Sequence, residues 1–365
     1  MLESLYIAAS FVFVISFIVF IHELGHYTVA KIAGIKVTDF AIGFGPKIVG
    51  IRDRSGTEWK LCWIPLGGYV KFLGDQDPAS MKAANISSLS EEQKKQSFIN
   101  KNLAVKSAVA VAGPLANFLL AIIILSGFFY FFGKIVASTE IALVERGSRA
   151  EQAGIKVNDK IIEVDGNKVE DFLDIERYVF SHPQIPLTFT IQRGEDIFTK
   201  IIVPEEIEKI DSSGNKLLVG RIGVGSSKVE YKRFGIISSI MLATSETKKV
   251  CMLTLKAIGQ MVVGSRSTKD VGGIVRITKY TAQSVKQGAI STLSFIAMLS
   301  INLGLVNLFP IPPLDGGHLL IYGIEAIFGK NKYTSVKEYV IKIGFVLLIA
   351  LMAFGIVNDI INFNS

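Results

Sequence analysis

Charged residues are scarce in this chain: Asp, Glu, Lys and Arg make up 19% of its 365 residues, against 50% hydrophobic residues. Ordinary soluble domains carry about 25% charged residues, so a soluble fold over the whole chain is excluded. The net charge of +7 is spread along the sequence, and no dense basic stripe with interleaved aromatic residues occurs. We therefore expect neither nucleic-acid binding nor nucleotide binding.

Cysteine is nearly absent, since Cys62 and Cys251 are the only two and neither belongs to a CxxC pair. This excludes a disulfide framework and a cysteine-rich metal site. Histidine is rare too, with four in the chain, and two of these, His22 and His26, lie four residues apart. A metal or catalytic site that uses histidine can therefore draw on only these four residues.

The chain has long uncharged runs instead, at residues 5–21, 107–133, 287–314 and 343–358. Each approaches the roughly 20 residues that a helix needs to cross the hydrocarbon core of a bilayer. We therefore predict a multi-pass α-helical membrane protein with four transmembrane helices. Loop 34–102 holds ten Lys and Arg, which places it on the cytoplasmic side by the positive-inside rule. Both termini are then expected on the outer side, together with segment 134–286.

The first apolar run ends in Ile-His-Glu-Leu-Gly-His at residues 21–26, which is an HExxH motif. On a helix, positions four apart share a face, so His22 and His26 can present both imidazoles to one Zn²⁺. Glu23 is then placed to take a proton from water. In soluble helices such histidines are often only satisfied polar groups. Ionisable residues inside an apolar span are costly, so here they indicate a functional site.

A zinc site with two histidines needs a third protein ligand, and Asp315 follows the third apolar run. Spans one and three both end on the cytoplasmic side in this topology, so their ends can meet. Two alternatives stay open. Residues 315–317 could be only a turn after a proline-rich stretch, or His318 could be the third ligand. Asn117, in the second apolar run, is either a polar link between helices or a further contact to the site.

Two segments between the spans differ from the helical pattern. Residues 37–74 carry alternating and turn-forming residues, which predicts a membrane-associated β-hairpin sheet. Residues 138–230 resemble one PDZ-like α+β domain, on the pattern Gly-Ser-x-Ala-x-x-Ala-Gly-Ile beginning at Gly147. Such a domain binds a peptide end or acts as a size filter. The expected domains are residues 1–133, 138–230, 231–286 and 287–365, with 234–264 as an amphipathic helix on the outer surface.

Taken together, HExxH, Ala112-Gly-Pro-x-Ala-Asn117, the PDZ-like insert and Asn307-x-x-Pro-x-Pro-x-Leu-Asp-Gly-Gly-His318 resemble the site-2 protease family. The resemblance is closest to bacterial intramembrane zinc metalloproteases that cleave anti-sigma factors and signal-peptide remnants. It covers nearly the whole chain. One PDZ-like module stands where some relatives have two.

The resemblance implies Zn²⁺ held by His22, His26 and Asp315, with Glu23 as general base. The substrate contacts that we expect, including the candidate Asn117, are at Asn117, Asn302, Asn307, Gly43 and Gly45. The expected substrates are single-span membrane proteins, pre-trimmed on the outer side of a bacterial inner membrane, with the active site towards the cytoplasm. The alternative function is a non-catalytic zinc-binding scaffold that holds partners through the PDZ-like domain. A metal transporter would need ionisable groups along several spans, and the second and fourth runs have none.

Overall fold

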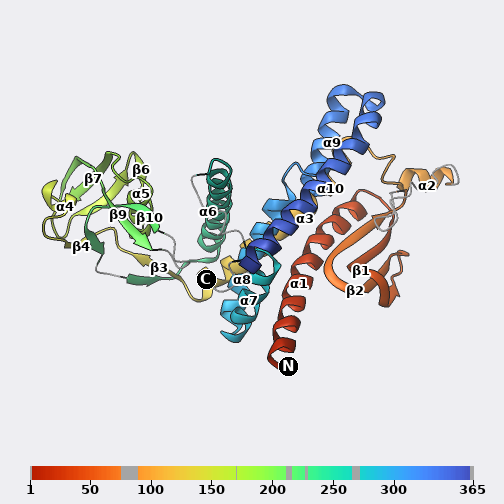
Figure 1. The fold of residues 1–365 in the computed structure, drawn as a ribbon, viewed down its shortest axis with the longest axis horizontal. Helices are drawn as coiled ribbons and strands as arrows, with labels where there is room; N and C mark the ends of the chain where they lie inside the picture. The colour runs from red at the N-terminus through yellow and green to blue at the C-terminus, as the bar shows by residue number, and fades with distance from the viewer. Residues whose placement is uncertain are drawn as a thin grey trace. The chain divides into compact units, whose positions relative to one another are not determined.

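The computed structural model describes residues 2–74, 89–169, 171–210, 216–226, 229–264 and 272–361. They fall into two units, residues 1–127 with 239–364, and residues 128–238, which we call the helical unit and the inserted unit. Long helices dominate the first and strands the second (Figure 1).

The helical unit contains the four apolar runs as helices. The helices are α1 (Leu2–Ile32), α2 (Glu91–Gln96), α3 (Leu103–Phe131), α6 (Ile236–Val262), α7 (Ile274–Lys286), α8 (Ala289–Asn307), α9 (Asp315–Phe328) and α10 (Lys330–Ile361). Among the described residues, four helical stretches are long and apolar enough to cross a membrane, at 5–32, 103–131, 289–307 and 342–359. The four predicted apolar helices are therefore confirmed, and their membrane orientation stays a prediction.

Helices α1, α3 and α8 pack through small residues and apolar side chains. Val14 and Ile18 of α1 are buried against Ile296 of α8. At Gly25, an added Cβ would lie 2.8 Å from the Cβ of Ala116 and would collide with the carbonyl of Ala112. The backbones of α1 and α3 can approach this closely only because residue 25 has no side chain.

Residues 236–262 form α6, which runs without a break through its charged middle, while its predicted place on the outer surface stays a prediction. Val250 and Cys251 of α6 pack against the buried cluster of Ala121, Ala297 and Ile301. One flank of α6 therefore packs against α3 and α8, while other apolar side chains such as Ile237 and Met241 are exposed.

Helix α7 is capped by a side chain from α10. Its own N-cap residue, Gly273, offers no side chain. The buried carboxylate of Asp359 accepts the backbone N–H of Gly273, Val275 and Arg276 at 2.9, 3.0 and 3.0 Å. A carboxylate at a helix N-terminus also meets the positive end of the helix dipole, so this contact fixes α10 to the start of α7.

The predicted hairpin sheet is confirmed as β1 (Val37–Arg52) and β2 (Glu58–Phe72). The two strands are long and bend, so residues 39–42 have partners both at 68–71 and at 58–61, while residues 49–52 pair with 58–61. The bends use glycines with positive φ, including Gly43 at +84° and Gly67 at +89°. Glycine adopts this backbone region without the steric cost of a Cβ.

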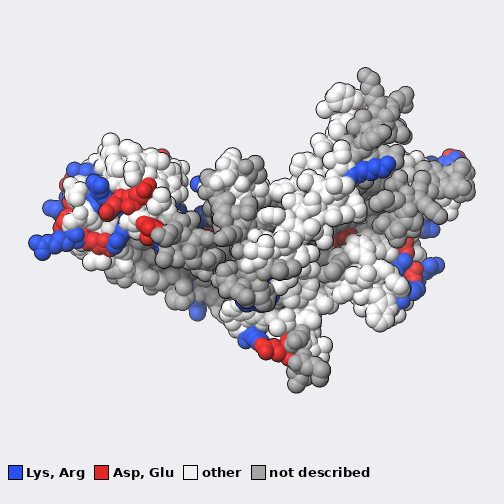
Figure 2. Space-filling model, viewed as in Figure 1, with Lys and Arg blue, Asp and Glu red and all other residues white. Residues whose placement is uncertain are grey.

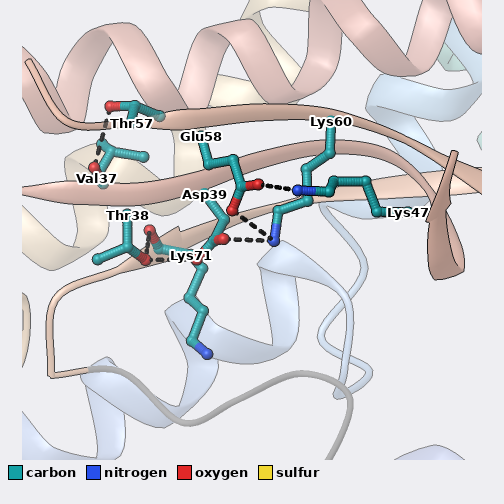
Figure 3. A network of polar contacts seen from close by, with 8 residues as sticks. All are labelled: Val37, Thr38, Asp39, Lys47, Thr57, Glu58, Lys60 and Lys71. Atoms are coloured by element: carbon teal, nitrogen blue, oxygen red, sulfur yellow. Dashed lines mark hydrogen bonds and ion pairs between the residues drawn. The ribbon is translucent and has the colours of Figure 1, made fainter. Parts of the chain in front are cut away.

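Polar contacts tie the rows of this sheet together (Figure 3). Lys60 pairs with Asp39 at 2.5 Å, and Lys47 pairs with Glu58 at 2.5 Å.

Elsewhere the sheet exposes large apolar side chains, such as Ile51 at 74% and Trp63 at 68% of their surface. An open, largely apolar groove of about 440 Å³ is lined by this sheet and Phe20 of α1. A sheet with this much exposed apolar surface suits contact with lipid better than with water.

The inserted unit holds two helices and ten strands among its described residues. They are β3 (Lys134–Ala137), β4 (Ile141–Val144), α4 (Arg149–Gln152), β5 (Lys160–Val164), β6 (Asn167–Lys168), α5 (Phe172–Phe180), β7 (Leu187–Arg193), β8 (Asp196–Ile202), β9 (Glu205–Ile210), β10 (Lys216–Arg221), β11 (Val224–Ser226) and β12 (Val229–Lys232). Its largest sheet has the order β6-β5-β7-β8, and β4 pairs with β11. Phe189, Ile161 and Ile175 are among the fully buried core residues. In Figure 2 charged atoms gather over this unit and over β1–β2, while the visible helical part is largely uncharged.

An ion pair between a buried carboxylate and a partly exposed arginine connects the loop before β5 to the end of β7. Asp159 is 1% exposed and lies 2.6 Å from the guanidinium of Arg193, which also donates to the carbonyl of Gly154 at 2.8 Å. Burial is the largest single effect and opposes ionisation of Asp159. The hydrogen bonds from Arg193 and from the backbone N–H of Lys156, together with the positive charges of these two residues, outweigh it and lower the pKa of the carboxyl. The charged pair therefore stabilises the inserted unit above the ordinary Asp pKa of about 3.9, and this stability is lost as pH falls through the lowered pKa.

We expect Asp159→Asn to destabilise the inserted unit by about 2 kcal/mol at pH 7, because it removes a charge-assisted hydrogen bond to a buried carboxylate. Hydrogen exchange of β5 and β7 in the full-length protein measures the change. Asp174→Asn is the matched control, since Asp174 pairs with Arg177 at 3.5 Å in a partly exposed i,i+3 pair worth about 0.5 kcal/mol or less. Equal protection in both variants at pH 7 would show that the Asp159 pair carries no special stability.

Candidate metal centre

Three side chains meet where α1 lies beside the start of α9. The Nε2 atoms of His22 and His26 are 3.2 Å apart. They lie 3.1 and 3.4 Å from the two carboxylate oxygens of Asp315. Within the described residues this is the group of His, Cys, Asp or Glu side chains that could hold a metal ion. The predicted ligands His22, His26 and Asp315 are thus brought together from opposite ends of the sequence.

The donor set fits zinc. Two ligand atoms about 2.0–2.1 Å from a tetrahedral Zn²⁺ are separated by about 3.3–3.4 Å. The Nε2–Nε2 separation of 3.2 Å is close to that spacing, and each Nε2 has one Asp315 oxygen nearby, at 3.1 or 3.4 Å. With one donor atom taken from each residue, all three lie within 4.8 Å of one another. Two imidazoles and one carboxylate leave a fourth position open, which distinguishes a catalytic zinc site from a structural one.

Helix α3 contacts both imidazole rings. The Nδ1 atom of His26 donates to the carbonyl of Val109 at 2.8 Å, so its Nε2 is left with a lone pair for a metal. Gly113 faces both rings: an added Cβ would lie 2.6 Å from His26 Cε1 and 2.8 Å from His22 Cε1. The Ala-Gly-Pro motif therefore supplies the space that the ligands occupy.

Glu23 lies between the ligands and the β1–β2 sheet. It is 9% exposed, and a Cβ added to Gly68 of β2 would lie 3.1 Å from its Cγ. The backbone of Val70 hydrogen-bonds the carboxylate. Strand β2 thus passes directly beside the candidate base at Gly68 and Val70.

The three candidate asparagines have different surroundings. Asn117 is fully buried on α3, with its Nδ2 3.2 Å from Nδ1 of His22. The Oδ1 of Asn302 on α8 accepts a hydrogen bond from Thr254 of α6 at 3.3 Å. Asn307 is the last residue of α8 and is half-buried. Among these, Asn117 is the one that the structure brings into contact with a ligand.

Gly43, Gly45 and His318 do not belong to the group of three converging side chains. Gly43 and Gly45 are bends of β1 with φ of +84° and +86°. His318, the rival third ligand, is exposed on α9 with its ring 6.3 Å from that of Tyr322, and it does not belong to the metal-binding group. Asp315 is also more than a turn residue, since it begins α9. Sequence reasoning missed the contacts of Val109, Gly68 and Val70, because two of them are made by backbone and the third by an absent side chain.

Comparison with known proteins shows which proteins are similar to this chain. Residues 10–351 match the sequence profile of peptidase family M50. A protein of Rickettsia conorii named as a zinc metalloprotease is 40% identical over 97% of this chain and 98% of its own length. One of Agrobacterium fabrum is 39% identical over 96% of this chain and 94% of its own length. Metalloprotease MmpA of Caulobacter vibrioides is 31% identical over 99% and 96%.

A solved structure is similar to part of the chain. The PDZ domain of an SdrC-like protein from Listeria monocytogenes aligns with 26% of this chain and 90% of its own length. The identity is 18% and the TM-score 0.20.

Proposed function

We propose that this chain, a zinc metalloprotease that belongs to peptidase family M50, hydrolyses single-span membrane proteins within the bilayer. One observation carries the proposal: the ligand pair His22 and His26 lies within an apolar helical stretch, residues 5–32, long enough to cross a membrane. A soluble protease has no need of a metal centre on such a helix. The wider role would be regulated intramembrane proteolysis of anti-sigma factors or signal-peptide remnants.

In this proposal His22, His26 and Asp315 hold the zinc, and Glu23 moves the proton. Zinc bound there polarises the scissile carbonyl and acidifies water. The Glu23 carboxylate accepts a proton from the attacking water and delivers it to the leaving amine as the peptide bond breaks. Its burial beside the ligands keeps bulk water from competing for that proton. A non-catalytic scaffold would have no use for a carboxylate in this position.

Substrate would bind along the sheet. A transmembrane helix keeps its carbonyls in internal hydrogen bonds, so it has to unwind before a water can attack one. The β1–β2 sheet beside Glu23 can supply replacement backbone partners by strand addition, with Gly43 and Gly45 shaping its bends. Asn307 and Asn302 would add side-chain amides to the unwound segment.

We further propose a bacterial inner-membrane location with both termini in the periplasm and the metal centre towards the cytoplasm. The ten basic residues of loop 34–102 support this orientation. The inserted unit would then lie in the periplasm, where it would select substrates already trimmed on that side, by size or by holding a new C-terminus.

The test uses the full chain reconstituted in liposomes with a tagged single-span substrate. We expect cleavage inside the apolar span, located by mass spectrometry of both products. Activity should be lost on zinc removal by a chelator and restored by added Zn²⁺. A second substrate with the same span and an intact folded outer domain should be cut more slowly. Cutting confined to soluble segments of either substrate would contradict the proposal.

A further inference from the structure

The two zinc-ligand histidines are held by one face of α3. Val109, Gly113 and Asn117 are spaced four residues apart, so they lie along one side of the helix. Val109 contacts His26, Gly113 faces both rings, and Asn117 contacts His22. Each imidazole therefore has its Nε2 directed at Asp315 and its Nδ1 directed at α3.

The Nδ1 partner decides which ring nitrogen can bind a metal. A neutral imidazole has one N–H and one lone pair, so Nε2 is free to ligate only when Nδ1 carries the hydrogen. For His26 this is ensured, because the Val109 carbonyl at 2.8 Å can only accept. For His22 the partner is the amide of Asn117, which has a donor end and an acceptor end.

As placed, the donor end of that amide faces the ring: Nδ2 of Asn117 lies 3.2 Å from Nδ1 of His22. This would put the ring hydrogen on Nε2, opposite to what a metal ligand needs. The Oδ1 atom of Asn117 is buried and has no hydrogen-bond partner, so no donor holds the amide in this orientation. The two ends of an amide have nearly the same shape, and a half-turn exchanges them.

We infer that Asn117 is a positioning residue whose Oδ1 accepts the Nδ1 hydrogen of His22 and so fixes the ring with Nε2 free for zinc. The amide is in the turned orientation in the metal-loaded protein. The backbone of Asn117 is held independently, since its carbonyl accepts the hydroxyl of Ser300 on α8 at 2.9 Å, and both residues are fully buried. This inference rests on the proposed function, and it assigns Asn117 to the metal ligand and not to the substrate.

The test compares zinc affinity, by chelator competition, in the full chain and three variants. Asn117→Leu keeps the size and removes the acceptor, and we expect about a 10–100-fold loss of affinity. Asn117→Asp keeps an acceptor oxygen, and we expect affinity within a few-fold of wild type. Ser300→Ala is the control for packing, since it removes the neighbouring helix link alone, and we expect unchanged affinity.

Two results would overturn the inference: wild-type affinity in Asn117→Leu, or equal losses in Asn117→Leu and Asn117→Asp with both proteins folded. If the variants do not fold, ¹⁵N-histidine spectra of zinc-loaded wild type decide, because the chain has only four histidines. Hydrogen on Nδ1 of His22 supports the inference and hydrogen on Nε2 overturns it. A wild type that binds no zinc would instead contradict the proposed function itself.

Discussion

Glu23→Gln is expected to lower the cleavage rate about 10²–10⁴-fold, the usual contribution of a general base. Glutamine has nearly the same shape but cannot accept the proton of the attacking water. Glu23 is not one of the three converging ligand residues, so the variant should bind zinc as wild type does. Rates are measured on the single-span substrate in liposomes, and zinc content by elemental analysis of the same samples.

Glu3→Gln is the matched control on the same helix. Glu3 is exposed and pairs with Lys286 at 2.7 Å, near the start of α1 and far along the chain from the motif. We expect its activity to equal that of wild type. If Glu23→Gln retained a tenth or more of the wild-type rate, another group would have to move the proton, and the assignment of Glu23 as base would be withdrawn.

Gly113→Ala is expected to lower zinc affinity about 10–100-fold and to remove most activity. The new methyl group would collide with Nε2 of His26 and lie 2.8 Å from Cε1 of His22. Overpacking of this kind costs about 1–3 kcal/mol, and here the atoms that have to move are those of the ligands. Chelator competition and substrate cleavage measure the two effects.

Gly127→Ala tests whether any glycine-to-alanine change in α3 would do the same. A Cβ at Gly127 meets no atom within 4 Å, so the variant should bind zinc normally. Alanine also favours the helix over glycine by up to about 1 kcal/mol, so its stability should not fall. Equal zinc affinity in the two variants would mean that the ligands move aside freely and that Gly113 does not shape the site.

The sequence was sufficient for the parts of this protein that depend on local pattern. Apolar runs predicted the four long helices, and alternating and turn-forming residues predicted the β1–β2 hairpin. The spacing of His22 and His26 requires only that α1 be a helix. The membership in a zinc metalloprotease family, predicted from motifs, is confirmed by the relatives.

What the sequence could not supply depends on contacts between segments. The pairing of residues 39–42 with two different parts of β2 follows from bends whose outcome no local pattern specifies. The support of His26 by Val109 is made by a carbonyl, a group that every residue has. Asn117 was recognised as polar in an apolar helix, but its contact with His22 depends on how α3 is placed along α1.

The division of the ligands between α1 and α9 also sets an order in time. Asp315 is synthesised 289 residues after His26. At about 5–20 residues per second, this leaves about 15–60 s during which the first helix carries the candidate base and two of the candidate ligands without the third. A nascent or prematurely ended chain therefore holds an incomplete candidate metal centre until α9 begins.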